Sequence, residues 1–279
     1  MQRKPEWLRI SIPLGKQYVN LKDIIADKKL HTICESGKCP NLSECWGRGT
    51  ATFMIMGNIC TRSCKFCNVE TGRPYALDWD EPNRLAETVK SMQLKHCVIT
   101  SVDRDDVRDF GARFWAATIR RVKEVNPETT IETLIPDFLG REQLIQTVIE
   151  AAPEIISHNM ETVRRLTPQV RNKAKYDTSL KTIGVVAASG KVKPKSGIMV
   201  GLGEKEEEVL QTMDDLLEVG CKVLTIGQYL QPTRKHWPVY EFIPPAQFER
   251  YKAIGLEKGF QFVESGPLVR SSYRAERHV

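Results

Sequence analysis

The segment Met56–Asn68 reads MGNICTRSCKFCN and places three cysteines close together. They are Cys60, Cys64 and Cys67, spaced C-x3-C-x2-C, and we call them the second triplet. A β-rich apolar run, Ala51–Gly57, ends three residues before the first of them. In parallel α/β folds, the loops that follow the strands carry the functional groups. We therefore expect this segment to be an active-site loop at the carboxyl end of a strand.

Short apolar runs, each followed by an amphipathic segment, recur from residue 51 to residue 258. Alternating strands and helices predict parallel βαβ units. The expected strands cover residues 51–57, 96–102, 129–136, 155–160, 196–201 and 223–229, and the expected helices cover residues 81–93, 113–125, 141–151, 161–166, 204–219 and 245–258. Six units match an α/β fold of the partial (β/α)6 TIM-like barrel class better than a closed eight-stranded barrel, and an open six-stranded sheet is the alternative.

This pattern divides the chain into three regions. Residues 51–258 form the expected barrel. Residues 1–50 lack the alternation and contain three more cysteines, while residues 259–279 are rich in polar and basic side chains. We expect both flanking regions to be extensions that pack on the barrel.

The composition is that of a soluble protein with a sizeable core, since 41% of the 279 residues are apolar and 27% are charged. There is no run of eighteen apolar residues and no apolar signal core near the start, so we expect no membrane helix and a cytoplasmic location. Six of the eight cysteines cluster near one end, which favours a metal site in a reducing compartment over disulfides. The other two, Cys97 and Cys221, stand in apolar segments, and we expect them to be buried.

The net charge is +6, and the basic residues are scattered along the chain. No stretch interleaves them with aromatic residues, so we expect no nucleic-acid partner. A modestly basic face would suit an acidic protein partner, and an ordinary solvated surface explains the charge equally well.

The C-x3-C-x2-C spacing, with Phe66 directly before the last cysteine, resembles the signature of the radical S-adenosylmethionine superfamily. The resemblance implies that Cys60, Cys64 and Cys67 are catalytic thiolates that bind three irons of a 4Fe–4S cluster, and that the fourth iron chelates S-adenosylmethionine. Electron transfer from the cluster would then yield a 5′-deoxyadenosyl radical, while the protein orients the cofactor and excludes water. A structural zinc site is the alternative, although zinc prefers four ligands, commonly in paired C-x2-C units.

The same resemblance implies a set of cofactor-binding residues. Phe66 would lie against the adenine, and a glycine-rich motif at the fifth expected strand would approach it closely. Asn159 and Glu161 look like ligands to ribose or substrate, but a turn residue and a helix-start carboxylate would explain them too. Strand-end polar groups can also satisfy loop backbone instead of a ligand. The expected set is Phe66, Asn68, Ser101, Glu132, Asn159, Glu161, Gly201 and Gln228.

The first triplet, Cys34, Cys39 and Cys45, has the more distinctive spacing C-x4-C-x5-C. Together with the second triplet it closely resembles the lipoyl synthase family, and the resemblance extends through residues 99–106, 131–138, 227–232 and 265–273. It implies a second, auxiliary 4Fe–4S cluster on the first triplet. A serine of the Arg-Ser-Ser-Tyr segment at residues 270–273 would be its fourth ligand. We expect Ser272 to be that catalytic ligand, with Ser271 as the neighbouring alternative, and without the resemblance both would pass for a solvated tail.

The implied reaction is the insertion of two sulfur atoms at C6 and C8 of a protein-bound octanoyl group, with the auxiliary cluster as sulfur donor. The implied partners are an octanoylated carrier, either the lipoyl domain of a 2-oxoacid dehydrogenase E2 or the glycine-cleavage H protein, and a reduced ferredoxin or flavodoxin. A monomer is the simplest expectation. Two alternatives remain: a non-enzymatic iron–sulfur protein for electron transfer or redox sensing, and another radical enzyme whose second cluster survives turnover.

Overall fold

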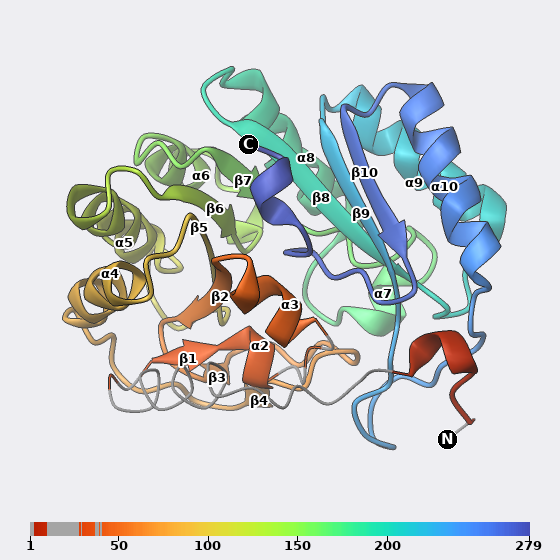
Figure 1. The fold of residues 1–279 in the computed structure, drawn as a ribbon, viewed down its shortest axis with the longest axis horizontal. Helices are drawn as coiled ribbons and strands as arrows, with labels where there is room; N and C mark the ends of the chain where they lie inside the picture. The colour runs from red at the N-terminus through yellow and green to blue at the C-terminus, as the bar shows by residue number, and fades with distance from the viewer. Residues whose placement is uncertain (1–2, 10–27, 29, 37–38, 40) are drawn as a thin grey trace.

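The strands of the chain form one curved, mostly parallel sheet, with helices on its outer side (Figure 1). The computed structural model describes residues 3–9, 28, 30–36, 39 and 41–279, so part of the expected extension at 1–50 lies outside the described residues. Within the described part, the sheet has eight strands in the order β1-β2-β5-β6-β7-β8-β9-β10. The strands are β1 (His31–Thr32), β2 (Thr50–Ile55), β5 (His96–Ser101), β6 (Thr130–Leu134), β7 (Ile155–Ser157), β8 (Lys193–Val200), β9 (Val223–Gln228) and β10 (Phe262–Gly266).

All of these strands except β1 run parallel, which is the arrangement of an open barrel. Two further short strands, β3 (Ile59–Cys60) and β4 (Glu70–Thr71), pair with each other in the second-triplet loop. The helices and short turns are η1 (Glu6–Leu8), α2 (Ile33–Ser36), α3 (Leu42–Gly47), α4 (Glu81–Ser91), α5 (Ala112–Val125), η2 (Phe138–Gly140), α6 (Glu142–Ile149), α7 (Thr167–Val170), α8 (Tyr176–Ala188), α9 (Glu206–Glu218), α10 (Pro245–Lys258) and η3 (Ala275–Arg277).

The expected helices form because one face of each is apolar and packs on the sheet. In α5, for example, Trp115, Ile119 and Val122 are completely buried, and the helix begins after Gly111, whose φ of +83° is left-handed. Helix α10 covers the predicted range, with prolines at its start and left-handed Gly259 at its end. The predicted strands and five of the six predicted helices are thus present within a few residues of their expected bounds.

The predicted helix at residues 161–166 is wrong. Glu161 has a φ of +65° and forms a bridge to Ile198 of β8, so the chain leaves β7 as an extension of the sheet. The crossover helix is instead α8, which follows the single turn of α7. A tertiary pairing therefore overrides the local helical signal here.

The expectation that residues 259–279 only pack on the barrel also needs correction. The first part of this region is β10, a seventh parallel strand, which pairs with β9 from Phe262 opposite Val223 to Gly266 opposite Gly227. The remainder, Leu268–Val279, runs back along the inner side of the sheet, and we call it the C-terminal tail (Figure 1).

The core between sheet and helices has one cluster around β2 to β6 and another around β8 to β10. Cys97 and Cys221 are at most 1% exposed and belong to these clusters, which confirms that both are buried. Among the helices described, none is both long and apolar enough to cross a membrane.

Candidate active site

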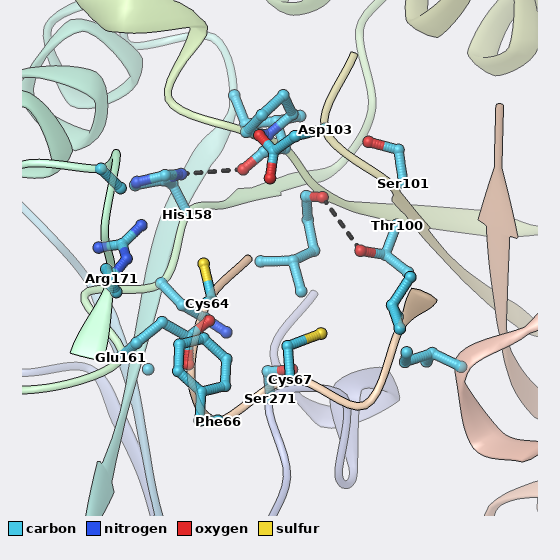
Figure 2. Close-up of a pocket in the computed structure, with 18 of the residues that line it drawn as sticks. Cys64, Phe66, Cys67, Thr100, Ser101, Asp103, His158, Glu161, Arg171 and Ser271 are labelled. Atoms are coloured by element: carbon cyan, nitrogen blue, oxygen red, sulfur yellow. Dashed lines mark hydrogen bonds between the residues drawn. The ribbon is translucent and has the colours of Figure 1, made fainter. Parts of the chain in front are cut away.

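A cavity of about 290 Å³ opens at the carboxyl end of the barrel. It is lined by the second-triplet loop, by residues at the ends of β5, β7, β8 and β9, and by the start of the C-terminal tail. Figure 2 shows Cys64, Phe66, Glu161 and Arg171 on one side of it and Thr100 and Ser101 on the other. The cavity therefore lies where parallel barrels place their active sites.

The second-triplet loop is tied to the barrel at both ends. The amide of Thr61 donates to the carbonyl of Asp103 at 3.1 Å, and the amide of Lys65 donates to the carbonyl of Val170 at 2.9 Å. Backbone hydrogen bonds to two separate loops fix where the loop lies over the cavity. The two bonded residues flank Cys64, so the loop that carries the three cysteines is held at the edge of the cavity.

Arg62, between the first two cysteines, attaches the loop to the barrel through buried ion pairs. Its guanidinium is 3% exposed, forms a bidentate pair with Asp105 at 2.8 and 2.9 Å, and donates to Asp137 at 2.9 Å. Burial alone would lower the pKa of Arg62, but these carboxylates and nearby Asp103 raise it above its ordinary value. Burial likewise opposes ionisation of Asp105, yet Arg62 lowers the pKa of that carboxyl to about 2. Against the effect of burial, Arg62 likewise holds Asp137 below its ordinary pKa, whereas burial raises the pKa of Asp103.

The thiols of the second triplet lie close enough to interact. Burial raises the pKa of Cys67 to about 11, and the proximity of Cys60 adds to the rise. Burial also raises the pKa of Cys64 to about 12, with Cys67 among the lesser causes. Buried thiolates crowded in this way need positive charge beside them, and coordinated iron supplies it. The donor set therefore fits an iron–sulfur cluster.

The first triplet also comes together, beside the C-terminal tail. Burial raises the pKa of Cys45 to about 12, and the next causes are Cys39 and Cys34. The amide of Cys39 donates to the carbonyl of Cys34 at 2.9 Å, while Asn41 Nδ2 donates to the carbonyl of Leu268 in the tail at 2.6 Å. The predicted juxtaposition of this triplet with the chain's end is thus present in the structure.

The two serines of the tail differ in position. Ser271 lines the same cavity as Cys67, and both are labelled in Figure 2. Ser272 is half-buried and is not part of the cavity wall. Arg270, directly before them, donates to the carbonyl of Gln228 at 3.2 Å, and its charge acts on Cys39. The tail is therefore positioned between the two triplets.

Three buried polar atoms in the cavity wall lack a hydrogen-bond partner among the described residues: Ser101 Oγ, Asp137 Oδ2 and Asn159 Oδ1. An unpaired buried polar atom is costly, so such atoms in a cavity suit the polar groups of a ligand. Position 197 has room only for glycine, because a Cβ there would lie 2.5 Å from Thr225 Oγ1 and 3.0 Å from Asn159 Oδ1. These atoms fit a cofactor as rich in polar groups as S-adenosylmethionine.

Glu161 and Arg171 add charge to the same wall (Figure 2). Burial raises the pKa of Glu161, and Arg171 opposes the rise. Arg171 is 6% exposed, and its guanidinium donates to two neutral acceptors, the carbonyl of Met160 at 3.1 Å and Ser179 Oγ at 3.0 Å. A buried guanidinium that borders a cavity is suited to an anionic group. Arg171 was not predicted from the sequence. It follows the short helix α7 in a basic run, and such a run is typical of a solvated surface.

Comparison with known proteins agrees with this geometry. The family model described as "Radical SAM superfamily" matches residues 54–216, and the model of the N-terminal domain of lipoyl synthase matches residues 1–39. The lipoyl synthase of Bacteroides thetaiotaomicron is 64% identical over 99% of this chain and 98% of its own length. The mitochondrial lipoyl synthase of Nematostella vectensis is 58% identical over 99% of this chain and 95% of its own.

This chain belongs to the lipoyl synthase family. Two solved structures with low identity share its fold. Methylornithine synthase has a TM-score of 0.54 at 14% identity, covering 91% of this chain and 79% of its own. The FeFe-hydrogenase maturase from Carboxydothermus hydrogenoformans has a TM-score of 0.60 at 11% identity, covering 94% and 68%. The fold expected from the sequence, a partial barrel of the radical S-adenosylmethionine type, is confirmed.

Family membership implies two 4Fe–4S clusters and S-adenosylmethionine. Within the described residues, no three His, Cys, Asp or Glu side chains are grouped as a single metal ion would require. A 4Fe–4S cluster takes its thiolates on separate irons, so its ligands do not converge on one atom. Both triplets, each with mutually interacting thiols, are compatible with that arrangement.

Four predicted cofactor ligands of this lipoyl synthase family member lie outside the cavity wall: Asn68, Glu132, Gly201 and Gln228. Gln228 is 1% exposed, and its Nε2 donates to the carbonyls of Val200, Tyr229 and Glu241 at 3.0–3.2 Å. Its Oε1 accepts from the amide of Ile243 at 2.8 Å. Because all its polar capacity is used, Gln228 orders a loop instead of contacting a cofactor.

Gly201 serves the same loop, since a Cβ there would lie 2.2 Å from Gln228 Nε2. Glu132 is 1% exposed and pairs with Lys195 at 2.8 Å, away from the cavity. Cofactor contact by Gly201, Glu132 and Gln228 is therefore not supported. Asn68 is exposed beside the second-triplet loop and is not part of the cavity wall. Phe66, Ser101, Asn159 and Glu161 do line the cavity, as expected.

Proposed function

We propose that this chain inserts two sulfur atoms at C6 and C8 of an octanoyl group carried on a protein, which completes the lipoyl group. The observation that carries the proposal is the placement of both cysteine triplets around the carboxyl end of one radical S-adenosylmethionine barrel, in a chain of the lipoyl synthase family. When bound, the two clusters and S-adenosylmethionine supply the radical that removes hydrogen and the sulfur that replaces it.

In this proposal Cys60, Cys64 and Cys67 hold the radical-generating cluster. Backbone hydrogen bonds and the Arg62 network tie the loop that carries these thiols to the barrel. The cavity below them excludes bulk water from a reactive radical.

Five residues of the cavity wall are proposed to hold S-adenosylmethionine. Phe66 gives an apolar surface for the adenine, and Ser101 and Asn159 offer unpaired polar atoms. Glu161 suits hydroxyl or ammonium groups, since a carboxylate accepts hydrogen bonds. Arg171 suits the cofactor's carboxylate, which a guanidinium can bind with charge-assisted hydrogen bonds.

For the auxiliary cluster, the proposed ligands are the first triplet and one serine of the tail. We retain Ser272 as the expected ligand and Ser271, which lines the cavity, as the alternative. A serine oxygen is a harder ligand than a thiolate and is unusual on iron. Substitution of each serine by alanine, followed by Mössbauer spectroscopy of the reconstituted enzyme, distinguishes them.

The proposed substrates and partners follow the family. The octanoyl group would arrive on a lipoyl domain or on the glycine-cleavage H protein, and electrons would come from a reduced ferredoxin or flavodoxin. We further propose a monomer that acts in a reducing cytoplasm. Among the described residues all eight cysteines are free thiols, which is consistent with that compartment.

The test is an anaerobic assay of reconstituted protein with reductant, S-adenosylmethionine and an octanoylated carrier peptide, read by mass spectrometry. We expect 5′-deoxyadenosine together with peptide that has gained sulfur. Absence of 5′-deoxyadenosine would support an electron-transfer or sensing protein. Formation of 5′-deoxyadenosine without sulfur in the peptide would support another radical enzyme.

A matched variant tests the auxiliary site. Cys39→Ala should abolish sulfur insertion while 5′-deoxyadenosine still forms, because the second triplet is intact. Cys97→Ala is the control, since Cys97 is completely buried in the core and belongs to neither triplet. Sulfur insertion by Cys39→Ala at the normal yield would show that the first triplet has been misassigned.

A further inference from the structure

The C-terminal tail crosses the interior of the barrel from its carboxyl end to its amino end. Near its start, Ser271 lines the cavity at the carboxyl ends of the strands. Near its end, His278 lies beside Lys193 and Phe262, which are the first residues of β8 and β10. His278 is 0% exposed, and η3 before it contacts β5 (Figure 1). The side chain of His278 is therefore enclosed by the sheet, while Val279 after it is exposed.

A buried polar cluster, which we call the anchor, receives this end. Its members are Glu132, Lys195 and His278. Lys195 Nζ donates to Glu132 Oε2 at 2.8 Å and lies 3.2 Å from His278 Nδ1, and all three residues are at most 1% exposed. An ammonium group can only donate, so His278 Nδ1 accepts and its proton is on Nε2. Lys193 Nζ adds a hydrogen bond to the His278 carbonyl at 2.6 Å.

The anchor makes the position of the tail specific. A buried ion pair such as Glu132–Lys195 is weak evidence for stability, because desolvation offsets most of the attraction. A buried ammonium does, however, require acceptors in a fixed direction. His278 is such an acceptor, and a tail displaced by one residue would present no imidazole there. The pair thus selects one register of the tail inside the barrel.

The other contacts of the tail lead to the first triplet. Asn41 donates to the Leu268 carbonyl at 2.6 Å, and the Tyr273 hydroxyl lies 3.2 Å from a carboxylate oxygen of Glu44. Glu276 accepts from Thr50 Oγ1 at 3.2 Å. The segment that carries the first triplet therefore contacts the tail at Leu268 and Tyr273, and Thr50 at the start of β2 contacts it at Glu276.

We propose that Glu132 and Lys195 are positioning residues for the auxiliary cluster. By fixing His278 they hold the tail in the register that presents Ser271 and Ser272 to the first triplet. This inference rests on the proposed role of a tail serine as an iron ligand, and it assigns a function to Glu132, which lies too far from the cavity to touch the cofactor.

The test compares two substitutions of His278 in the full-length reconstituted enzyme. His278→Asn places an amide oxygen near the position of Nδ1 and keeps an acceptor for Lys195, whereas His278→Leu fills the space without one. Arg277→Ala, at the adjacent exposed position, is the matched control. The readouts are hydrogen–deuterium exchange of the tail, iron per chain, and 5′-deoxyadenosine formation.

We expect His278→Leu to increase exchange of the tail and to lower the iron content from about eight to about four per chain, the content of one 4Fe–4S cluster. Formation of 5′-deoxyadenosine should stay at the wild-type rate, because the second triplet is untouched. His278→Asn and Arg277→Ala should behave as wild type. The inference is overturned if His278→Leu keeps wild-type exchange and iron content, or if His278→Asn loses as much iron as His278→Leu.

A second variant guards against a general folding defect. Glu132→Leu combined with Lys195→Met replaces the ion pair by apolar groups of similar size, a change that is often neutral for stability. We expect this double variant to fold, to release the tail and to lose the auxiliary cluster. If the tail exchanges faster but eight irons remain, the proposed link from anchor to cluster is wrong. If Ser271→Ala and Ser272→Ala both keep eight irons, the serine assignment fails independently of the anchor.

Discussion

Loss of Arg62 should lower the stability of this enzyme far more than loss of an arginine in an exposed ion pair. It is 3% exposed, and its partners Asp105 and Asp137 are 8% and 1% exposed. Arg62→Met keeps the length of the side chain but leaves buried Asp137 without its counter-ion and Asp105 with only the half-exposed Lys173, at 3.1 Å. Breaking a buried pair in this way costs about 3–5 kcal/mol. For 279 residues the entropy of unfolding is about 0.6 kcal/mol per kelvin, so the melting temperature should fall by about 5–8 °C.

The assay is urea unfolding of the cluster-free protein at pH 7, followed by tryptophan fluorescence. Arg113→Met is the matched control: Arg113 forms an equally short pair, 2.9 Å to Asp109, but its side chain is 78% exposed. Exposed pairs of this kind contribute about 0–1 kcal/mol. If Arg62→Met and Arg113→Met destabilise the protein by the same amount, the Arg62 network does not hold the second-triplet loop as described.

Three further predictions concern the pH dependence, the tail and the cofactor. Burial raises the pKa of Glu81 to about 7 in the folded protein, so stability should be lost as pH rises from about 4.5 to 7. Glu81→Gln should remove this loss, stabilising the protein by about 3 kcal/mol at pH 8 and not at pH 4.5, as urea unfolding at both values will show. Gly227→Ala should increase hydrogen–deuterium exchange of the tail, because a Cβ there would lie 2.1 Å from the Val269 carbonyl oxygen. Gly184→Ala in helix α8, where a Cβ would make only ordinary van der Waals contact, should instead stabilise the protein by about 0.5–1 kcal/mol. Arg171→Gln should weaken S-adenosylmethionine binding by about 10- to 100-fold in calorimetry, the loss expected for a charged hydrogen bond, and unchanged affinity would exclude Arg171 from the site.

The sequence was informative where local pattern and tertiary role agree. The apolar run at residues 51–57 followed by the second triplet predicted a strand and its active-site loop, and β2 with the loop is found there. Helix α10 was predicted at its observed bounds, and prolines at its start and a glycine after its end mark it in the sequence. Such signals act within about fifteen residues, so they can be read without knowing the fold.

Other features depend on partners that are distant in sequence. Strand β10 contains two apolar residues, Phe262 and Val263, and becomes a strand because β9 offers a free edge. Gln228 was expected in the cavity because it ends a strand, but a strand end has neighbours on several sides, and the loop at residues 241–243 uses its amide. The strand pattern alone does not say which side a terminal side chain faces.

The buried contacts of Glu132 link the region of the two cysteine triplets to the C-terminal tail. A carboxylate in mid-strand of a barrel is costly unless a cation faces it, and Lys195, 63 residues later, is that cation. The pair in turn requires an acceptor, which His278 supplies from the last turn of the chain. The tail that ends there passes the first triplet and the cavity on its way. In our proposal, this buried polar cluster positions the tail for the auxiliary-cluster site on the first triplet.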